Sequence, residues 1–333
     1  MKIFFDNTQS LGDTALALKP LFVIKQLYPN DTLIMLTNGL GKSLYRNCEF
    51  IDEILTENED YARDDKFKRI GENDILILIN SDGRHISLAK QSKCQCIITF
   101  VRPRNFYSPR FRLSWLIHKF FKEESAQILS LVRLIDKKHY DKHIKSIDFS
   151  KCTFATDKKN ESQIRAFLSH INLSYQKIIN INIFCHTAAS YNFQFDDWCA
   201  MISSLAREFK DFLFVLTNYE GNAIQFSEFK EKNIAVFVNN ADLLNLVALS
   251  KHFSLCISVS TGNIHIARAL RIPCLALYPN KDKIRYAGDY YGRGGGKTFD
   301  VFILKTKWRG EYERNKNAFF EKMRGVLAKM AGL

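Results

Sequence analysis

Residues 254–279 read SLCISVSTGNIHIARALRIPCLALYP, and this stretch contains every element of a β-α-β unit. An apolar run at 254–259 is followed by a hydroxyl-rich loop that contains Gly262. A helical pattern at 263–270 and a second apolar run at 274–278 complete the unit. Largely apolar runs of this length are typical of strands buried on both faces, as in parallel sheets, and the run at 75–79 is continuous. The stretch therefore predicts an α/β fold.

The same alternation of short β-branched or aromatic runs with helical patterns extends along the whole chain, in two series. Strands are expected in the first series at residues 2–6, 32–37, 74–80 and 96–101. Strands are expected in the second series at 177–184, 211–217, 234–238, 254–259 and 274–278. The clearest helical patterns cover 14–28, 196–209, 241–250, 263–270 and 312–330.

The two series are separated by residues 137–174, a polar stretch without a strand pattern. A chain of 333 residues is also longer than one core usually holds. We therefore expect an N-terminal domain at 1–170 and a second domain at 171–310. The remaining helix at 311–333 could pack back on the N-terminal domain.

The bulk composition describes a basic, folded protein. Forty-eight Lys and Arg against 35 Asp and Glu give a net charge of +13, which favours anionic partners. No apolar run reaches the roughly 18 residues that span a bilayer, and the N-terminus does not read as a signal peptide. These features predict a cytoplasmic protein. The eight scattered cysteines lack zinc-site spacing and are expected to be reduced and mostly buried.

The first candidate site is the stretch TQSLGDT at residues 8–14, directly after the first expected strand. Ligands of open α/β sheets bind beyond the carboxyl ends of strands, where Asp13 is placed to face them. Asp is also a common N-cap of a following helix. From the residues alone, Asp13 is therefore either a site carboxylate or a helix cap.

The second candidate is SVSTGNIH at residues 258–265, between a buried strand and a helix. Hydroxyls, Gly262 and backbone N–H groups at a helix N-terminus suit the binding of phosphate oxygens. The alternative is ordinary N-capping by Ser260 or Thr261, with His265 a surface residue. A run of hydroxyls with a glycine exceeds what one cap needs, which favours the phosphate site.

Two further stretches give weaker signals. CHTAASYNF at 185–193 follows the first strand of the second series and suits a phosphate-facing loop. Residues 102–122 interleave basic and aromatic side chains. That composition fits an anionic membrane surface, a grip on phosphorylated acceptor groups or single-stranded nucleic acid. An amphipathic helix with a solvated basic face is the structural alternative.

Taken together, these motifs resemble glycosyltransferase family 9, the heptosyltransferases of the lipopolysaccharide inner core. The match consists of SLGD at 10–13, the following stretch that ends in Tyr-Pro at 28–29, and residues 254–279 with their S/T-G-x-x-H loop. The resemblance implies a GT-B architecture, with two Rossmann-like domains and the donor in the C-terminal one. It also implies an inverting, metal-independent mechanism without a cofactor, in which Asp13 deprotonates the acceptor hydroxyl.

The resemblance and the local composition assign further residues to each substrate. The donor-binding residues are expected to be Thr187, Glu220, Ser260, Thr261, Gly262 and His265. The acceptor-binding residues are expected to be Ser10, Gly12, Arg102, Arg104, Arg110 and Arg112. The implied partners are a nucleotide sugar, an anionic lipid-linked glycan and the face of the inner membrane, with no nucleic acid.

Two departures from the family pattern affect the donor side. A Lys of a K-x-W pattern is absent, because Tyr191, Asn192 and Phe193 stand at that place. Ser260 stands where the family often has an acid. The phosphate cations could instead come from Lys281, Lys283, Arg285, Arg293 and Lys297.

Three functions are therefore compatible with the sequence. The first is transfer of heptose from ADP-heptose to an inner-core acceptor. The second is transfer from another nucleotide sugar to a different surface glycan. The third is a non-catalytic protein that binds an anionic ligand or membrane.

Overall fold

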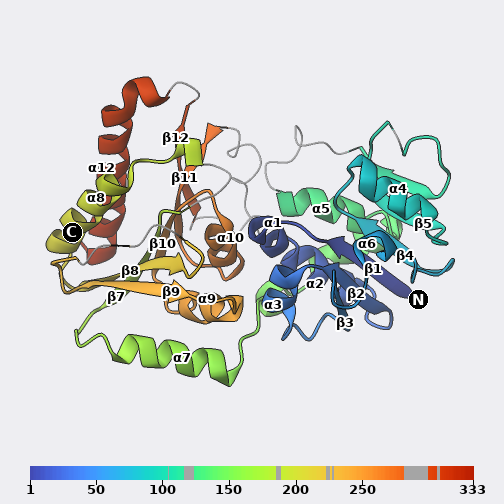
Figure 1. Ribbon diagram of the computed structural model, residues 1–333, viewed down its shortest axis with the longest axis horizontal. Coiled ribbons are helices and arrows are strands. Elements are labelled where there is room, and N and C mark those ends of the chain that lie inside the picture. The colour runs from blue at the N-terminus through green and yellow to red at the C-terminus, as the bar shows by residue number, and fades with distance from the viewer. Residues whose placement is uncertain are drawn as a thin grey trace. The chain divides into compact units, whose positions relative to one another are not determined.

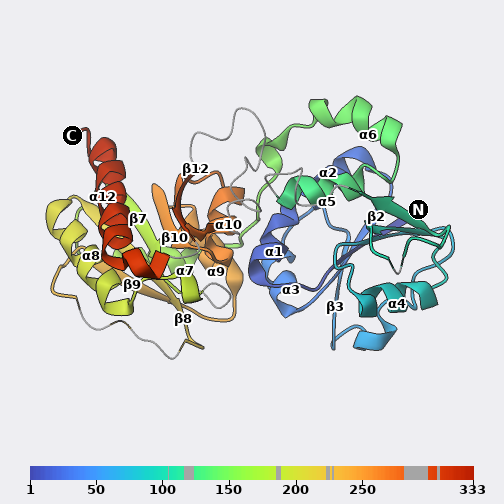
Figure 2. The same ribbon diagram turned by 90° about the horizontal axis from the view of Figure 1, so that it is seen from above.

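The computed structural model describes residues 1–103, 105–115, 124–184, 189–222, 226, 229–280, 299–305 and 308–333. The chain divides into two compact units, with the boundary between Ala155 and Thr156. Each unit contains one six-stranded sheet, and all the paired strands run parallel (Figures 1 and 2). We describe each unit by itself.

The first unit consists of alternating strands and helices up to its last strand. Its strands are β1 (Lys2–Asn7), β2 (Thr32–Thr37), β3 (Glu53–Thr56), β4 (Ile75–Leu78), β5 (Cys96–Phe100) and β6 (Phe111–Ser114). Its helices are α1 (Leu11–Leu16), α2 (Leu18–Leu27), α3 (Gly39–Tyr45), α4 (Gly83–Gln91), α5 (Glu124–Val132) and α6 (Lys137–His143).

The strand order β3-β2-β1-β4-β5-β6 places β1 at the point where the winding direction changes. From β1 the chain proceeds outward to β2 and β3, and it then returns to pair β4 with the other side of β1. The connections that follow β1 and β4 therefore diverge at the carboxyl edge of the sheet. A switch point of this kind is where open α/β sheets bind ligands.

The second unit repeats this plan. Its strands are β7 (Lys177–Asn182), β8 (Phe212–Tyr219), β9 (Ile234–Asn239), β10 (Leu255–Val259), β11 (Cys274–Pro279) and β12 (Phe299–Leu304). Its helices are α7 (Lys158–Ser169), α8 (Phe195–Glu208), α9 (Leu243–Ser250), α10 (Gly262–Ala269) and α12 (Tyr312–Ala331). The order β12-β11-β10-β7-β8-β9 places the change of winding direction between β7 and β10.

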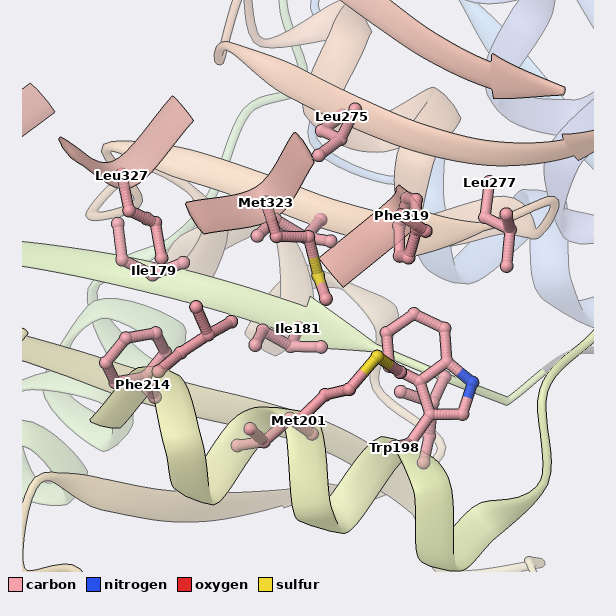
Figure 3. Packing of buried hydrophobic residues seen from close by; sticks show 14 of the residues in the cluster. Ile179, Ile181, Trp198, Met201, Phe214, Leu275, Leu277, Phe319, Met323 and Leu327 are labelled. Carbon is pink, nitrogen blue, oxygen red and sulfur yellow. The ribbon is translucent and has the colours of Figure 1, made fainter. Parts of the chain in front are cut away.

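The core of the second unit lies between its sheet and the pair α8 and α12. Alternate side chains of β7 such as Ile179 and Ile181 meet Trp198 of α8 and Phe319 of α12 in one buried cluster (Figure 3). The expectation that the C-terminal helix packs back on the N-terminal domain is corrected here. Its apolar face is buried against the second sheet, because Phe319, Met323 and Leu327 are all fully buried there.

The boundary between the units lies before α7, whereas the sequence was expected to divide at residue 170. The reason is a buried polar contact between α7 and α9. Asn160 is fully buried, and its Nδ2 donates to Asp242 Oδ2 at 2.9 Å and to Asn245 Oδ1 at 2.8 Å. A buried amide needs such partners, so this contact fixes α7 on the second unit.

The structure confirms the nine expected strands to within a few residues and adds β3, β6 and β12. The single helix expected at 14–28 is instead two helices, α1 and α2, that meet at Ala17. Pro20 explains the break, because a proline clashes with the carbonyl four residues earlier, here that of Leu16. The helical interpretation of residues 102–122 is wrong where the structure describes them, since β6 lies within this range.

Phe319 should be a main contributor to the stability of the second unit. Its ring is fully buried and lies 5.6 Å from Trp198 and 5.3 Å from Phe302, centroid to centroid. The substitution Phe319→Ala should lower the free energy of unfolding by about 3–5 kcal/mol, because it leaves a cavity. Urea denaturation followed by tryptophan fluorescence measures this loss, since Trp198 and Trp308 both lie in this core.

The matched control is Asn317→Ala on the exposed face of the same helix. It should change the free energy of unfolding by less than about 0.5 kcal/mol. Equal losses from the two substitutions would contradict the packing of α12 described above.

Candidate active site

Asp13 lies at the carboxyl edge of the first sheet, in the first turn of α1. Ser10 occupies the N-cap position of that helix with extended backbone angles, φ −66° and ψ 164°. The Ser10 hydroxyl donates to Asp13 Oδ2 at 2.9 Å. Asp13 is therefore not the N-cap, so the capping alternative is wrong. The carboxylate is partly exposed at the end of the helix that carries positive partial charge.

The segment that carries Asp13 is held in place by side chains from neighbouring elements. Thr37 Oγ1 donates to the Asn7 carbonyl at 2.8 Å, and Asn38 Nδ2 donates to the Gln9 carbonyl at 3.0 Å. On the far side, the Tyr45 hydroxyl donates to the Thr14 carbonyl at 2.7 Å. Three backbone carbonyls that flank the loop thus have fixed donors. These hydrogen bonds limit the movement of the loop backbone and so hold the Asp13 carboxylate close to one position.

A buried ion pair lies beneath the same loop. Lys66 Nζ contacts the Asp6 carboxylate, and both side chains are almost completely buried. The same ammonium donates to Thr8 Oγ1 at 2.9 Å. Burial raises the pKa of the Asp6 carboxyl, and the charge of Lys66 acts in the opposite direction. Lys66 therefore connects the end of β1 to the first residue of the loop.

The expected acceptor residues of the first unit have different surroundings. Ser10 is exposed, and Gly12 is partly exposed beside Asp13. Arg102 is exposed in the turn after β5, and its Nε donates to Ser81 Oγ at 3.0 Å. Ser81 follows β4, so Arg102 lies on the same carboxyl edge as Asp13. Arg104 lies outside the described residues.

Arg110 and Arg112, which were also expected to bind the acceptor, both donate hydrogen bonds to backbone carbonyls. The Arg110 guanidinium donates to the carbonyls of Lys90, Ser92 and Cys94, at 2.9, 2.6 and 2.7 Å. Arg112 Nη1 donates to the carbonyls of Leu134 and Ile135, which follow α5, at 3.2 and 2.9 Å. These donors stabilise backbone carbonyls that no regular element satisfies.

The second candidate site lies at the carboxyl edge of the second sheet, after β10. Thr261 is the N-cap residue of α10, with φ −154° and ψ 170°, and Gly262 begins the helix. Within the described residues, the Thr261 side chain makes no capping hydrogen bond. Thr261 therefore occupies the N-cap position without capping the helix through its hydroxyl, so the interpretation that this hydroxyl serves as an ordinary N-cap is wrong. Ser260 is buried, while Thr261 and Gly262 are partly exposed.

A row of buried polar side chains connects this loop to the neighbouring strands. Asn182, at the end of β7, donates to Ser258 Oγ of β10 at 3.4 Å. Asn263, the second residue of α10, donates to Thr217 Oγ1 of β8 at 3.1 Å. These contacts cross the switch point of the second sheet and fix the start of α10 against it.

The remaining residues expected to bind the donor differ in their exposure, and several lie outside the described residues. Glu220 is exposed directly after β8, on the same carboxyl edge as the loop at 260–262. His265 is the fourth residue of α10 and is only 3% exposed, so the alternative of a surface histidine is wrong. Thr187 and the proposed cations lie outside the described residues: Lys281, Lys283, Arg285, Arg293 and Lys297.

The three residues that replace the family's K-x-W pattern are structural. Phe193 is 4% exposed and belongs to the core of the second unit. Asn192 Oδ1 accepts from Trp198 Nε1 at 2.8 Å, and its Nδ2 donates to the Ile183 carbonyl. Tyr191 packs against the same core. None of the three supplies a cation.

Several residues of these sites were missed from the sequence. Thr37 ends β2 and Asn38 follows it, and their position at a strand end was a signal that could have identified them. Asp6 ends the first expected strand, but nothing in the sequence indicates its pairing with Lys66, because sixty residues of chain separate the two and only the fold brings them together. Asn263 lies within the phosphate-type motif, but its contact with Thr217 depends on the pairing of β7 with β8.

Residues 153–292 match the model of glycosyltransferase family 9 (heptosyltransferase), and this range includes the loop at 260–265. The resemblance to glycosyltransferase family 9 is confirmed. A Haemophilus influenzae protein named "Putative glycosyltransferase" is 24% identical over 293 residues, which cover 84% of this chain and 82% of that protein.

Three solved structures have the same fold. A family 9 glycosyl transferase from Veillonella parvula has a TM-score of 0.67 at 15% identity, over 95% of this chain and 88% of that one. ADP-heptose lipopolysaccharide heptosyltransferase II of E. coli has a TM-score of 0.66 at 12% identity, over 99% and 100%. E. coli heptosyltransferase WaaC with ADP has a TM-score of 0.59 at 13% identity, over 95% and 100%. The architecture is GT-B, with two Rossmann-like domains, as expected.

Among the described helices, none combines the length and the apolar character that a bilayer span requires.

Gly41 provides a test of the bracing around Asp13. A Cβ at Gly41 would lie 1.9 Å from Thr37 Oγ1, which donates to the Asn7 carbonyl. The substitution Gly41→Ala should therefore displace Thr37 and lower the free energy of unfolding by about 1–3 kcal/mol. Chemical denaturation measures the change.

Gly39→Ala is the matched control in the same helix, because a Cβ there would have nothing within 4 Å. It should be neutral or stabilising by up to about 1 kcal/mol. If Gly41→Ala were as well tolerated as Gly39→Ala, the close approach of α3 to the end of β2 would be contradicted.

Proposed function

We propose that this protein is an inverting glycosyltransferase that moves heptose from ADP-heptose to an acidic, lipid-linked inner-core acceptor. The proposal rests most directly on one observation. The family-9 match contains a loop at the start of α10, and Asp13 lies at the corresponding edge of the other sheet. The two edges supply complementary chemistry, namely an anion-binding helix N-terminus and a carboxylate base.

The second unit is the proposed donor site. The N–H groups at the start of α10 suit the oxygens of a diphosphate, and the helix dipole favours negative charge there. Glu220 follows the second strand of this Rossmann-like unit, where an acid commonly accepts hydrogen bonds from a ribose. The similarity in fold to WaaC, whose structure holds ADP, supports an adenine nucleotide as donor.

The first unit is the proposed acceptor site. Asp13 would accept the proton of the acceptor hydroxyl while that oxygen attacks the anomeric carbon of the donor sugar. The bond from this carbon to the diphosphate breaks, and its electron pair leaves with ADP. Attack from the face opposite the leaving group inverts the anomeric centre. In this scheme α10 stabilises the charge that develops on the leaving diphosphate, so no metal ion is needed.

Ser10 and Arg102 would have supporting roles in this scheme. The Ser10 hydroxyl, which donates to Asp13 Oδ2, holds the carboxylate in one orientation. Arg102 is exposed on the same edge and suits an anionic group of the acceptor. An acidic acceptor also agrees with the net charge of +13.

A second candidate function is transfer from a different nucleotide sugar. The observation that favours it is the structural use of Asn192 and Phe193, where the family's phosphate-binding Lys is expected. Ser260 in place of the usual acid points the same way. Both changes lie on the donor side, so they affect the identity of the donor more than the role of Asp13.

Asp13→Asn tests the assignment of the base. The substitution keeps the size of the side chain but removes the proton acceptor, so transfer should fall by about 10²–10⁴-fold. Donor binding should be retained, because the donor loop lies in the other unit. Product formation from ADP-heptose and thermal shifts with ADP-, GDP- and UDP-sugars measure the two properties.

Glu49→Gln is the control, since it makes the same acid-to-amide change at an exposed position of the first unit. Near-normal turnover in Asp13→Asn would contradict the role of Asp13. Selective stabilisation by a GDP- or UDP-sugar would favour the second candidate function. Without a thermal shift from any nucleotide sugar, a non-catalytic binding protein would be the better interpretation.

A further inference from the structure

Three aromatic side chains form an exposed cluster on the first unit. Phe106, Tyr107 and Trp115 are 50%, 90% and 60% exposed, which is unusual for large apolar side chains. Phe106 and Tyr107 lie in the turn between β5 and β6, and Trp115 follows β6. We call these three residues the aromatic patch.

The rings of the patch contact one another while remaining open to solvent. The Phe106 ring lies 5.5 Å from that of Tyr107 and 5.6 Å from that of Trp115, with interplanar angles of 83° and 90°. Edge-to-face contacts of this kind are favourable and hold the rings as a unit. The patch is therefore an ordered apolar surface that the described residues of the unit leave uncovered.

Cationic side chains lie beside the patch. Tyr107 forms one wall of an open groove of about 510 Å³, and Lys90 and Ser87 of α4 line the same groove. The Lys90 side chain is exposed. Arg102, also exposed, begins the turn that carries Phe106 and Tyr107, where its backbone N–H donates to Asn105 Oδ1 at 2.8 Å. Positive charge and aromatic surface thus occur together.

We propose that the aromatic patch is the surface through which this protein docks on a bilayer of anionic lipid. Trp and Tyr favour the boundary between headgroups and acyl chains, because each has an apolar body and a polar atom. Lys and Arg beside them are attracted to anionic headgroups. The inference rests on the proposed function only in that a lipid-linked acceptor would be presented at such a surface.

The geometry of the rings argues against the main alternative, single-stranded nucleic acid. Successive bases stack on aromatic faces that are available as platforms. In the patch, each contact of the central ring is made edge to face, so the three rings do not share a common plane. A cluster of differently oriented rings is better suited to insertion into a fluid interface.

Tryptophan fluorescence gives a direct test, because the chain has three tryptophans and only Trp115 is exposed. Trp198 and Trp308 are buried, at 0% and 4% exposure. With the full chain, phosphatidylcholine vesicles containing about one quarter phosphatidylglycerol should shift the emission to the blue. The shift should be absent in Trp115→Phe, and raising the salt to about 0.5 M should weaken binding.

Co-sedimentation with the same vesicles measures the contribution of the whole patch. Replacing Phe106, Tyr107 and Trp115 together by Ser should lower the vesicle partition coefficient by about tenfold or more, since each ring loses its apolar contact. The control is Leu40→Ser with Val238→Ser, which removes two exposed apolar side chains elsewhere. The control should sediment like the unaltered protein.

The outcomes separate this inference from the proposed function. Transfer to a lipid-free, water-soluble acceptor should be unchanged in the triple variant, and Asp13→Asn should still bind vesicles. Equal sedimentation of the triple variant and the unaltered protein would overturn the inference. The same conclusion would follow if the vesicles gave no blue shift, or if single-stranded oligothymidylate gave it and the vesicles did not.

Discussion

Each sheet of this protein changes its winding direction at a central strand, and the positions of the polar groups follow from this constraint. β1 has β2 on one side and β4 on the other, and β7 has β8 and β10 in the same relation. The connections that leave the central strands must diverge, so polar loops at their carboxyl ends are not covered by the next crossover. The loop that carries Asp13 follows the central strand β1, and the loop at 260–262 follows β10, which pairs with the central strand β7. The fold itself therefore selects the two places where the chain can expose site residues on a rigid base.

The two sites achieve their rigidity by different means. In the first unit, side chains of Thr37, Asn38 and Tyr45 donate to carbonyls around the Asp13 loop, and Lys66 connects Asp6 to Thr8. Removing one partner of such a buried ion pair is strongly destabilising, because the other charge stays buried without a partner. Lys66 and Asp6 are therefore held to this one arrangement. In the second unit, the donor-side loop is fixed by hydrogen bonds along the sheet, from Asn182 to Ser258 and from Asn263 to Thr217.

Much of the fold could be predicted from the sequence because its inner strands are buried on both faces. β4 is uniformly apolar and β10 is apolar except for Ser258, and both were identified from this pattern. The three missed strands, β3, β6 and β12, all lie at sheet edges. β3 and β6 have only four residues each, and most of β12 is partly exposed, so their patterns resemble those of loops; β6 even contains the exposed Arg112.

The sites were less predictable than the fold. Asp13 and the loop at 260–262 could be located because each follows a strand that was recognised. Arg110 and Arg112 were assigned to the acceptor by their charge, but their guanidinium groups are used by backbone carbonyls that no sequence pattern indicates. The pairing of Lys66 with Asp6 likewise depends on tertiary structure. Charge composition identifies where cations are frequent, and the fold decides which of them face a ligand.

Hydrogen–deuterium exchange with and without ADP is the most direct test of the central claim, that the two sheet edges divide the chemistry between them. Amide groups at the start of α10 have no partner four residues earlier within the helix, and a bound diphosphate should accept hydrogen bonds from them. ADP should therefore slow exchange at residues 260–265 and leave residues 8–14 unchanged. Protection of residues 8–14 without protection of 260–265 would contradict the account.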